Sequence, residues 1–146
     1  MNVLRKHRLW ETFLVQKMEF SWMEVHEIAE QLEHLRSDKL IEQLDKLLGH
    51  PRFDPHGDPI PDADGNMPVM GAMPLSEQSV GKKYKLVAVA DSSPAFLSLL
   101  DKLQLSLNGT VELLEVQEFD RSMTVVINRK TRATLSRDVS KNLLVV

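Results

Sequence analysis

Hydrophobic positions recur three and four residues apart through the beginning of the chain, which is the period of an amphipathic helix. From residue 2 to about residue 18 these positions are Val3, Leu4, Leu9, Trp10, Phe13 and Leu14, with Val15 beside them. The same period predicts a second helix from Ser21 to about Leu35, and Glu24 stands where it completes a capping box with Ser21. A third helix is predicted from Ser37, its N-cap, to Gly49, which ends it as a C′ residue.

Three short helices within the first 49 residues form a very small core, and small helical units are commonly stabilised by oligomerisation. Such a core is too small to bury all of the apolar surface that the helices carry. This surface comes from Trp10, Phe13, Leu14 and Trp22, together with the stripe Leu40, Ile41, Leu44, Leu47 and Leu48. We therefore predict that the helical part forms a homodimer. The alternative is that the C-terminal half of the chain covers these residues.

The segment from residue 50 to residue 74 contains all but one of the prolines. Because proline lacks a backbone donor and biases its predecessor away from helix, an extended connection is predicted. The run Asp62-Ala63-Asp64-Gly65-Asn66 looks like part of a calcium-binding loop, but Ile60 and Gly71 stand where that loop needs ligands, so a plain turn is predicted. For His56 we expect a solvated loop histidine rather than a metal ligand.

From residue 75 onward apolar and polar residues alternate, which is the period of β-strands. The predicted strands cover residues 84–89, 110–116, 123–127, 131–135 and 142–146. Ser93 as a cap and Pro94 at the first helical position predict one inserted helix. Short strands in this number are typical of a small SH3-like barrel. The predicted fold class is α+β, with a three-helix metal-binding and dimerisation domain at 1–49, a proline-rich linker at 50–74 and an SH3-like β-barrel at 75–146.

Charge and composition exclude several classes of function. The chain has 18 basic and 21 acidic side chains, so it lacks the basic excess of a nucleic-acid surface, and aromatic residues make up only 5% of it. The absence of cysteine removes disulfides, thiolate zinc sites and cysteine nucleophiles. The sequence contains neither a signal peptide nor a membrane-spanning run, so we expect a soluble, cytoplasmic protein with no membrane partner.

Histidine and glutamate residues lie one helical turn apart in two of the predicted helices. In the first helix these are His7 and Glu11, and in the second they form the stripe His26, Glu30, Glu33 and His34. Imidazole and carboxylate donors suit divalent Mn, Fe, Co and Zn, so the spacing indicates a metal site between two helices. The same spacing fits ordinary surface ion pairs, and the residues alone leave both interpretations open.

Four motifs follow one another in order: His7–Glu11 (HRLWE), Glu24–Asp38 (EVHExAExxEHxxSD), Leu48–Pro51 (LGHP) and Asp54–Pro61 (DPHGDPIP). In these motifs the chain resembles the metal-dependent regulators of the diphtheria-toxin-repressor and manganese-regulator family (DtxR/MntR). The resemblance is close from Leu4 to Pro61 and looser over the C-terminal part, which resembles the SH3-like or FeoA-like domain of some members. It implies a transcriptional repressor that senses a divalent metal, and not an enzyme.

The resemblance also implies a set of ligands. One metal position would be lined by His7, Glu11 and His26, and the other by Glu30, Glu33 and His34, completed by side chains of a winged-helix domain. Glu30 stands where iron-type members carry cysteine and manganese-type members carry glutamate, and a carboxylate suits Mn2+ or Fe2+. In some members the SH3-like domain adds ligands from just before its inserted helix. Here residues 91–95 lack the expected Glu and Gln, and Asp91 alone offers a carboxylate.

In that family a winged helix-turn-helix domain binds DNA ahead of the metal-binding helices. Only six residues precede His7, so we expect this chain to be an expressed fragment that touches DNA only through a domain it does not contain. A metal-independent dimerisation module is the main alternative. A di-metal carboxylate enzyme is disfavoured, because Gln31 stands three residues before His34, where a Glu-x-x-His unit requires glutamate.

Overall fold

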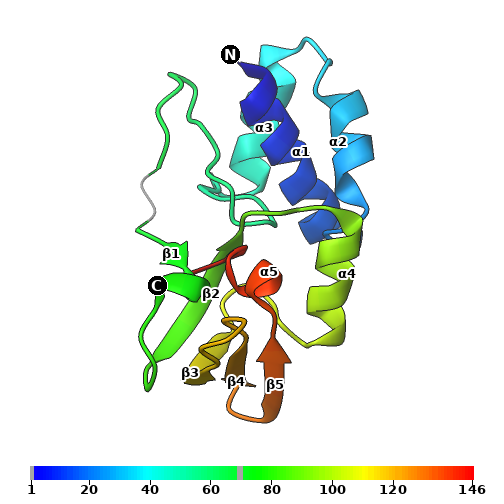
Figure 1. Cartoon of the computed structure of the whole chain (residues 1–146). Helices are drawn as coiled ribbons and strands as arrows, with labels where there is room; N and C mark the ends of the chain where they lie inside the picture. The colour runs from blue at the N-terminus through cyan, green and yellow to red at the C-terminus, as the bar shows by residue number, and fades with distance from the viewer. Residues whose placement is uncertain (1, 69–70) are drawn as a thin grey trace. The chain divides into compact units, whose positions relative to one another are not determined.

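The computed structural model describes residues 2–68 and 71–146, and the chain divides into two compact units, Met1–Met70 and Gly71–Val146 (Figure 1). The first unit is helical and the second is built on a β-sheet, so the predicted α+β class is confirmed. None of the helices in the described ranges is long and apolar enough to cross a membrane.

The first unit contains three helices, α1 (Asn2–Lys17), α2 (Val25–Leu32) and α3 (Asp38–Leu47), and α1 packs against the other two (Figure 1). Their core consists of Leu9, Trp10, Ala29, Ile41, Leu44 and Ile60, with Phe13, Leu32 and Leu48 at its edge. The prediction that Trp10, Leu14, Ile41 and Leu44 contribute to a dimer surface is wrong, because all four are buried in the chain. The large apolar side chains that α3 leaves exposed are Leu40 and Leu47.

The second helix is shorter than predicted. Ser21 N–H donates to Glu24 Oε2 at 2.8 Å, which is half of the expected capping box, but the next residues form a turn and α2 begins only at Val25. Its last helical residue is Leu32. Glu33 is therefore the C-cap, and the predicted helical stripe stops one turn early.

Both predicted ends of the third helix are confirmed. Ser37 Oγ accepts from Leu40 N–H at 3.2 Å, which caps the start of α3. At its end Gly49 has a φ of +76°, and His50 N–H donates to Asp45 C=O at 2.8 Å. These features form a Schellman motif, in which glycine supplies the left-handed residue that a Cβ would disfavour.

The proline-rich segment packs against the helices through part of its length. Ile60 enters the helical core, and Arg8 on α1 donates a hydrogen bond to Pro59 C=O. His56 is only 3% exposed, so the prediction of a solvated loop histidine is wrong. The predicted plain turn after Pro61 is confirmed, because Asp62 Oδ1 accepts two backbone N–H bonds at 2.9 Å within it.

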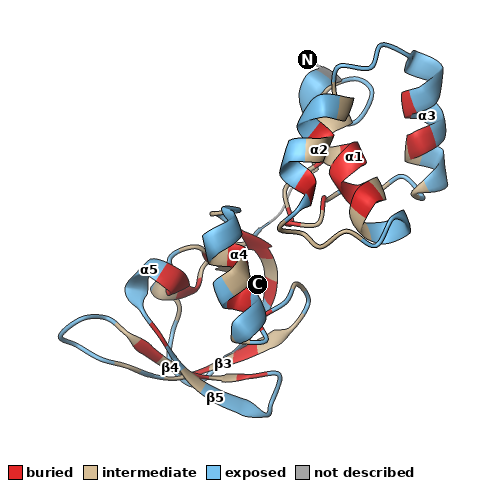
Figure 2. Cartoon of the chain, turned by 90° about the vertical axis from the view of Figure 1, so that its right-hand side faces the viewer, coloured by how far each residue is buried: buried red, intermediate tan, exposed pale blue. Residues whose placement is uncertain are grey.

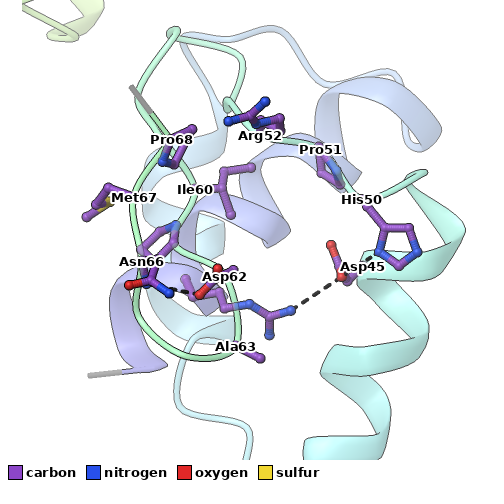
Figure 3. A pocket seen from close by; sticks show the side chains of 12 residues that line it. Asp45, His50, Pro51, Arg52, Ile60, Asp62, Ala63, Asn66, Met67 and Pro68 are labelled. Carbon is purple, nitrogen blue, oxygen red and sulfur yellow. Dashed lines mark hydrogen bonds and ion pairs between the residues drawn. The ribbon is translucent and has the colours of Figure 1, made fainter. Parts of the chain in front are cut away.

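A hollow of about 330 Å3 lies between this segment and the helices (Figure 3). At its edge Asp45 Oδ2 accepts from His50 Nδ1 at 2.8 Å and pairs with Arg5 at 3.4 Å (Figure 3). Asp45 thus joins the end of α3 to the start of α1.

The second unit is an antiparallel six-stranded sheet in the order β1-β6-β2-β3-β4-β5. Its strands are β1 (Met73–Pro74), β2 (Lys83–Val89), β3 (Thr110–Val116), β4 (Met123–Ile127), β5 (Thr131–Leu135) and β6 (Leu143–Val145). The helical pieces are η1 (Leu75–Glu77), α4 (Pro94–Lys102) and α5 (Arg137–Ser140). The five predicted strands and the inserted helix are all present, and β1, η1 and α5 were not predicted.

The alternation of apolar and polar residues along the strands accounts for the core of this unit. Along β4 every second residue is buried, and β3 follows the same pattern over most of its length. Figure 2 colours the buried positions red. The largest fully buried side chains of this unit are Leu75, Leu86, Leu97, Leu100, Leu113, Met123, Ile127, Leu135 and Leu143. Ser93 Oγ accepts from Phe96 N–H at 3.3 Å, which confirms the predicted cap of α4.

Candidate metal centre

The first predicted set of ligands converges on Glu11. His7 lies one turn before Glu11 on α1, and His7 Nε2 is 3.3 Å from Glu11 Oε2. His26, near the start of α2, places its Nδ1 3.8 Å from the same oxygen. The ligand atoms of these three residues all lie within 4.8 Å of one another. The packing of α2 against α1 thus brings together three candidate ligands that the sequence predicted on two separate helices.

The ring of His7 is oriented by a residue from beyond the end of α2. His7 Nδ1 lies 2.9 Å from Glu33 Oε2, and a carboxylate can only accept a hydrogen bond. The protonated ring, which the raised pKa of His7 favours, donates to both Glu33 and Glu11; the neutral ring keeps its proton on Nδ1, so its Nε2 lone pair is then available to a cation. A carboxylate that fixes the tautomer of a histidine in this way is typical of the surroundings of metal ligands.

The residues of the second predicted set, Glu30, Glu33 and His34, do not converge on one another. Glu30 Oε2 faces His26 Nε2 at 3.6 Å, and Glu33 Oε1 faces His34 Nε2 at 3.8 Å. Within the ranges that the structure describes, no group of three close ligand atoms includes Glu30, Glu33 or His34. Because the resemblance completes this position with side chains of another domain, its assignment stays a prediction.

A further set of ligands also includes Glu11 and was not predicted. His56 Nδ1 lies 3.8 Å from Glu11 Oε2 and 4.0 Å from Asp54 Oδ2, and all three side chains are at most 4% exposed. The ligand atoms of Glu11, Asp54 and His56 again lie within 4.8 Å of one another. Glu11 is thus common to two trios, which we name the outer trio (His7, Glu11, His26) and the inner trio (Glu11, Asp54, His56).

Local hydrogen bonds fix the orientation of the Asp54 and His56 side chains. Asp54 Oδ1 accepts from the backbone N–H groups of His56 and Asp58, each at 2.9 Å, which holds the carboxyl group in one orientation. His56 Nε2 donates to Trp22 C=O at 2.8 Å, and the two rings stack at 6.2 Å. The other ring nitrogen of His56, Nδ1, faces Glu11 and Asp54.

The charge balance in this cluster moves the pKa values of its members. Burial, with the charges of Asp58 and Glu11 adding to it, raises the pKa of Asp54 to about 8. Burial by itself also raises the pKa of Glu11, but hydrogen bonds with His7 and Asp54 and the charge of His56 outweigh it, so this pKa is lowered. The pKa of His7 is raised, first by its hydrogen bond with Glu11, and burial opposes the shift.

These residues fit a divalent cation. Asp54 Oδ2 is buried and accepts no hydrogen bond from a donor group of the described chain, so its hydrogen bond with Glu11 requires a proton shared by the two carboxyl groups. Two buried carboxyl groups side by side need either a shared proton or a cation between them. Imidazole nitrogen and carboxylate oxygen are ligands for Mn2+, Fe2+ and Zn2+, and no thiolate is available to favour a softer ion.

Comparison with known proteins places this chain in a family. Residues 1–62 match the family described as "Iron dependent repressor, metal binding and dimerisation domain", and residues 73–146 match the FeoA domain. A solved structure of a manganese-dependent transcriptional repressor is 37% identical with a TM-score of 0.92, and the match covers 99% of this chain and 78% of that one. The chain belongs to the DtxR/MntR family of metal-dependent repressors.

Two further relatives of this family agree. A manganese-dependent transcriptional repressor in complex with manganese is 36% identical, with a TM-score of 0.91, over 99% of this chain and 68% of that one. The iron-dependent repressor IdeR of Mycobacterium leprae is 36% identical over 92 residues, 63% of this chain and 38% of the relative. The chain thus spans less than half of this curated relative. The FeoA match confirms the prediction of an SH3-like C-terminal domain.

Proposed function

We propose that this chain is the metal-sensing and dimerising part of a repressor that responds to Mn2+ or Fe2+. The observation that carries the proposal is the convergence of three imidazoles and a second carboxyl group on Glu11. The family gives independent support, because its members include proteins named for dependence on manganese and on iron.

The residues around Glu11 would hold the metal and couple it to the arrangement of three segments. His7 and Glu11 lie on α1, His26 lies on α2, and Asp54 and His56 lie on the proline-rich segment. A bound ion supplies positive charge that offsets the buried carboxylates and ties these segments together. The ion then favours the arrangement with which it makes these contacts, and this differential affinity is what a metal sensor requires.

We propose that DNA is bound by a winged-helix domain outside this chain and that the helical unit forms a homodimer. Leu40 and Leu47 on α3 are 39% and 58% exposed, which leaves an apolar stripe for a second copy to cover. Glu30, Glu33 and His34 would form the second metal position once side chains of the DNA-binding domain join them. This chain would then act in the cytoplasm, without a membrane partner and without enzymatic activity.

Calorimetric titration of the chain with MnCl2, and with FeSO4 under anaerobic conditions, tests the metal-sensing proposal. We expect Glu11→Gln to weaken binding by at least tenfold, because the variant loses the charged ligand common to both trios. Glu42→Gln on α3 is the matched control, since Glu42 is exposed and lies in neither trio, and it should bind as the wild type does. Equal affinity of wild type and Glu11→Gln would overturn the proposal.

A further inference from the structure

We propose that the second unit binds a small phosphorylated molecule of the sugar-phosphate class in a hollow beside α5. The hollow has a volume of about 480 Å3, and its positively charged lining residues are Arg121, Arg137 and Lys141, so we name it the basic hollow. It shares no residue with the outer or the inner trio. The inference therefore goes beyond the proposed function and does not depend on it.

Three segments that are far apart in the sequence meet at the basic hollow. η1 supplies Ser76 and Glu77. The connection from β3 to β4 supplies Arg121, and α5 supplies Arg137. α5 contacts η1, whose first residue, Leu75, is fully buried. The packing of the second unit thus holds charged residues from separate segments around one concave space.

The two arginines have no ionic partner in the protein. Among the described residues no carboxylate pairs with Arg121 or Arg137, whereas Lys141 Nζ lies 3.3 Å from Asp138 Oδ1. The side chains of that pair are 54% and 89% exposed, and exposed pairs contribute little, so an anion can compete for Lys141. A guanidinium group binds phosphate through two parallel hydrogen bonds. The basic hollow is therefore suited to an anion with several oxygens.

The charge of the basic hollow matches a phosphate monoester. Its lining contains three cations and one carboxylate, that of Glu77, which leaves an excess of two positive charges. A phosphate monoester carries about −1.5 to −2 charges near neutral pH. A ligand with a single carboxylate would leave one of the two charges uncompensated.

Size and the remaining polar groups favour a ligand with hydroxyl groups. Pockets of about 300–1,000 Å3 hold whole small molecules, so inorganic phosphate would fill only part of this one. The carboxylate of Glu77 accepts hydrogen bonds, and the hydroxyl of Ser76 both donates and accepts, which suits the hydroxyls of a sugar. None of the described residues that line the basic hollow is aromatic, so a nucleobase would have no ring on which to stack.

Duplex DNA is another source of phosphate groups, and the structure favours it less. Residues 71–146 include 10 basic and 8 acidic side chains, which is far from the strong basic excess of a DNA-binding surface. The charges of Arg121 and Arg137 line a concave space that also contains Glu77, and this carboxylate repels a continuous row of phosphates. A small molecule with one phosphate group avoids this repulsion.

Calorimetric titration of the whole metal-free chain with glucose-6-phosphate tests the proposal, and glucose and inorganic phosphate are titrated separately. We expect a Kd of about 1 mM or tighter for glucose-6-phosphate, weaker binding of inorganic phosphate and no binding of glucose. Arg121→Gln and Arg137→Gln should each weaken binding about tenfold, because a hydrogen bond between charged groups is lost. Arg132→Gln is the matched control, since Arg132 is exposed on β5 and does not line the basic hollow.

Glu77→Gln separates the two parts of the ligand. It should strengthen the binding of inorganic phosphate, because a repelling charge is removed, and it should reduce the preference for glucose-6-phosphate, because a carboxylate acceptor is lost. Unchanged affinities for both probes would overturn the role of Glu77 and with it the sugar-phosphate class.

The remaining outcomes decide the site itself, and circular dichroism confirms the fold of each variant. Absence of glucose-6-phosphate binding would overturn the proposal. Equal weakening by Arg132→Gln and Arg137→Gln would overturn it as well, since this result indicates a general attraction to surface charge. Binding of a short mixed-sequence DNA duplex that is weakened by Arg137→Gln, with no binding of glucose-6-phosphate, would assign the basic hollow to DNA instead.

Discussion

Glu33 Oε2 lies 2.9 Å from His7 Nδ1, so a residue from beyond the end of α2 orients a candidate ligand on α1. The two residues are 26 positions apart in the chain, and both side chains are 13% exposed. Through this contact the carboxylate of Glu33 holds the tautomer in which His7 Nε2 faces Glu11.

We predict that Glu33→Ala weakens Mn2+ binding at the outer trio by about 10–100-fold, as loss of a partner that orients a metal ligand usually does. Glu33→Gln should recover part of the affinity, because the amide oxygen still accepts from His7 Nδ1. Titration calorimetry measures both variants. If Glu33 acted only as a ligand beside His34, His34→Ala would weaken binding as much as Glu33→Ala, and the orienting role would be refuted.

The stability of the metal-free protein should fall as pH rises from about 5 to 8. The pKa of Asp54 is raised from 3.8 to about 8 and that of His7 is raised above 6.5, so both groups hold protons in the folded state that the unfolded chain has released. Their stabilising contributions are complete below the unfolded pKa values and are lost as pH rises through the folded ones. The lowered pKa of Glu11 acts in the opposite direction, but below its unfolded value of 4.5 and so outside this window.

Thermal unfolding followed by circular dichroism at several pH values checks this prediction. Asp54→Asn should flatten the slope between pH 5 and 8, because the amide does not titrate. Asp62→Asn serves as the control, since Asp62 lies in an exposed turn and its pKa is lowered by backbone hydrogen bonds. A melting temperature that rises steadily across this range in the wild type would contradict the account.

Metal affinity should show the opposite pH trend. A ligand must lose its proton before it binds, so Mn2+ binding should strengthen as pH rises toward the Asp54 pKa of about 8. Calorimetry in buffers of different ionisation enthalpy counts the protons released per ion. Release of the same number of protons by wild type and by Asp54→Asn would show that Asp54 is not a ligand.

The sequence predicted those residues of this centre that contacts within one helix bring together. His7 and Glu11 were predictable because a helix places residues four apart side by side, and the resemblance supplied His26 as their partner. Asp54 and His56 were missed because their burial depends on tertiary contacts of the proline-rich segment, namely Ile60 in the helical core and the bond from Arg8. The only available signal was the position of both residues within the DPHGDPIP motif.

The difference between local and tertiary contacts also explains which elements of the fold the sequence predicted. Alternation predicted the strands of the second unit, and caps at Ser37 and Ser93 predicted two helix starts, because these signals are local. The four residues of α5 and the two of β1 are too few to show a period. The early end of α2 at Leu32 was missed, since the apolar pattern continues to Leu35 while the chain must already turn toward the N-cap of α3.

Charged substitutions on α3 should dissociate the proposed homodimer. Leu40→Glu and Leu47→Glu each place a carboxylate on the exposed apolar stripe, and burial of an unpaired charge in an interface is strongly unfavourable. Sedimentation velocity should report a monomer for the double variant and a dimer for the wild type. Glu42→Lys, on the same helix, is the control for a simple change of charge, and a dimer that survives in the double variant would place the interface elsewhere.

In the second unit Gly109 should tolerate no side chain. A Cβ at Gly109 would lie 2.8 Å from Asn128 Oδ1, which accepts from Thr110 N–H at 3.0 Å, and 3.1 Å from Ser106 C=O. Gly109→Ala should therefore lower the free energy of unfolding by about 1–3 kcal/mol, the cost of a broken bond with its partner left unsatisfied. Gly71→Ala, with nothing within 4 Å, is the control, and urea denaturation measures both.

Anomalous scattering at the manganese edge, from crystals of the chain grown with Mn2+, tests the central claim most directly. The account predicts a strong anomalous peak beside the Glu11 carboxylate, within reach of the ligand atoms of the outer trio, the inner trio or both. Crystals of Glu11→Gln should lose or weaken this peak. Strong manganese peaks elsewhere on the chain, with none beside Glu11, would contradict the account.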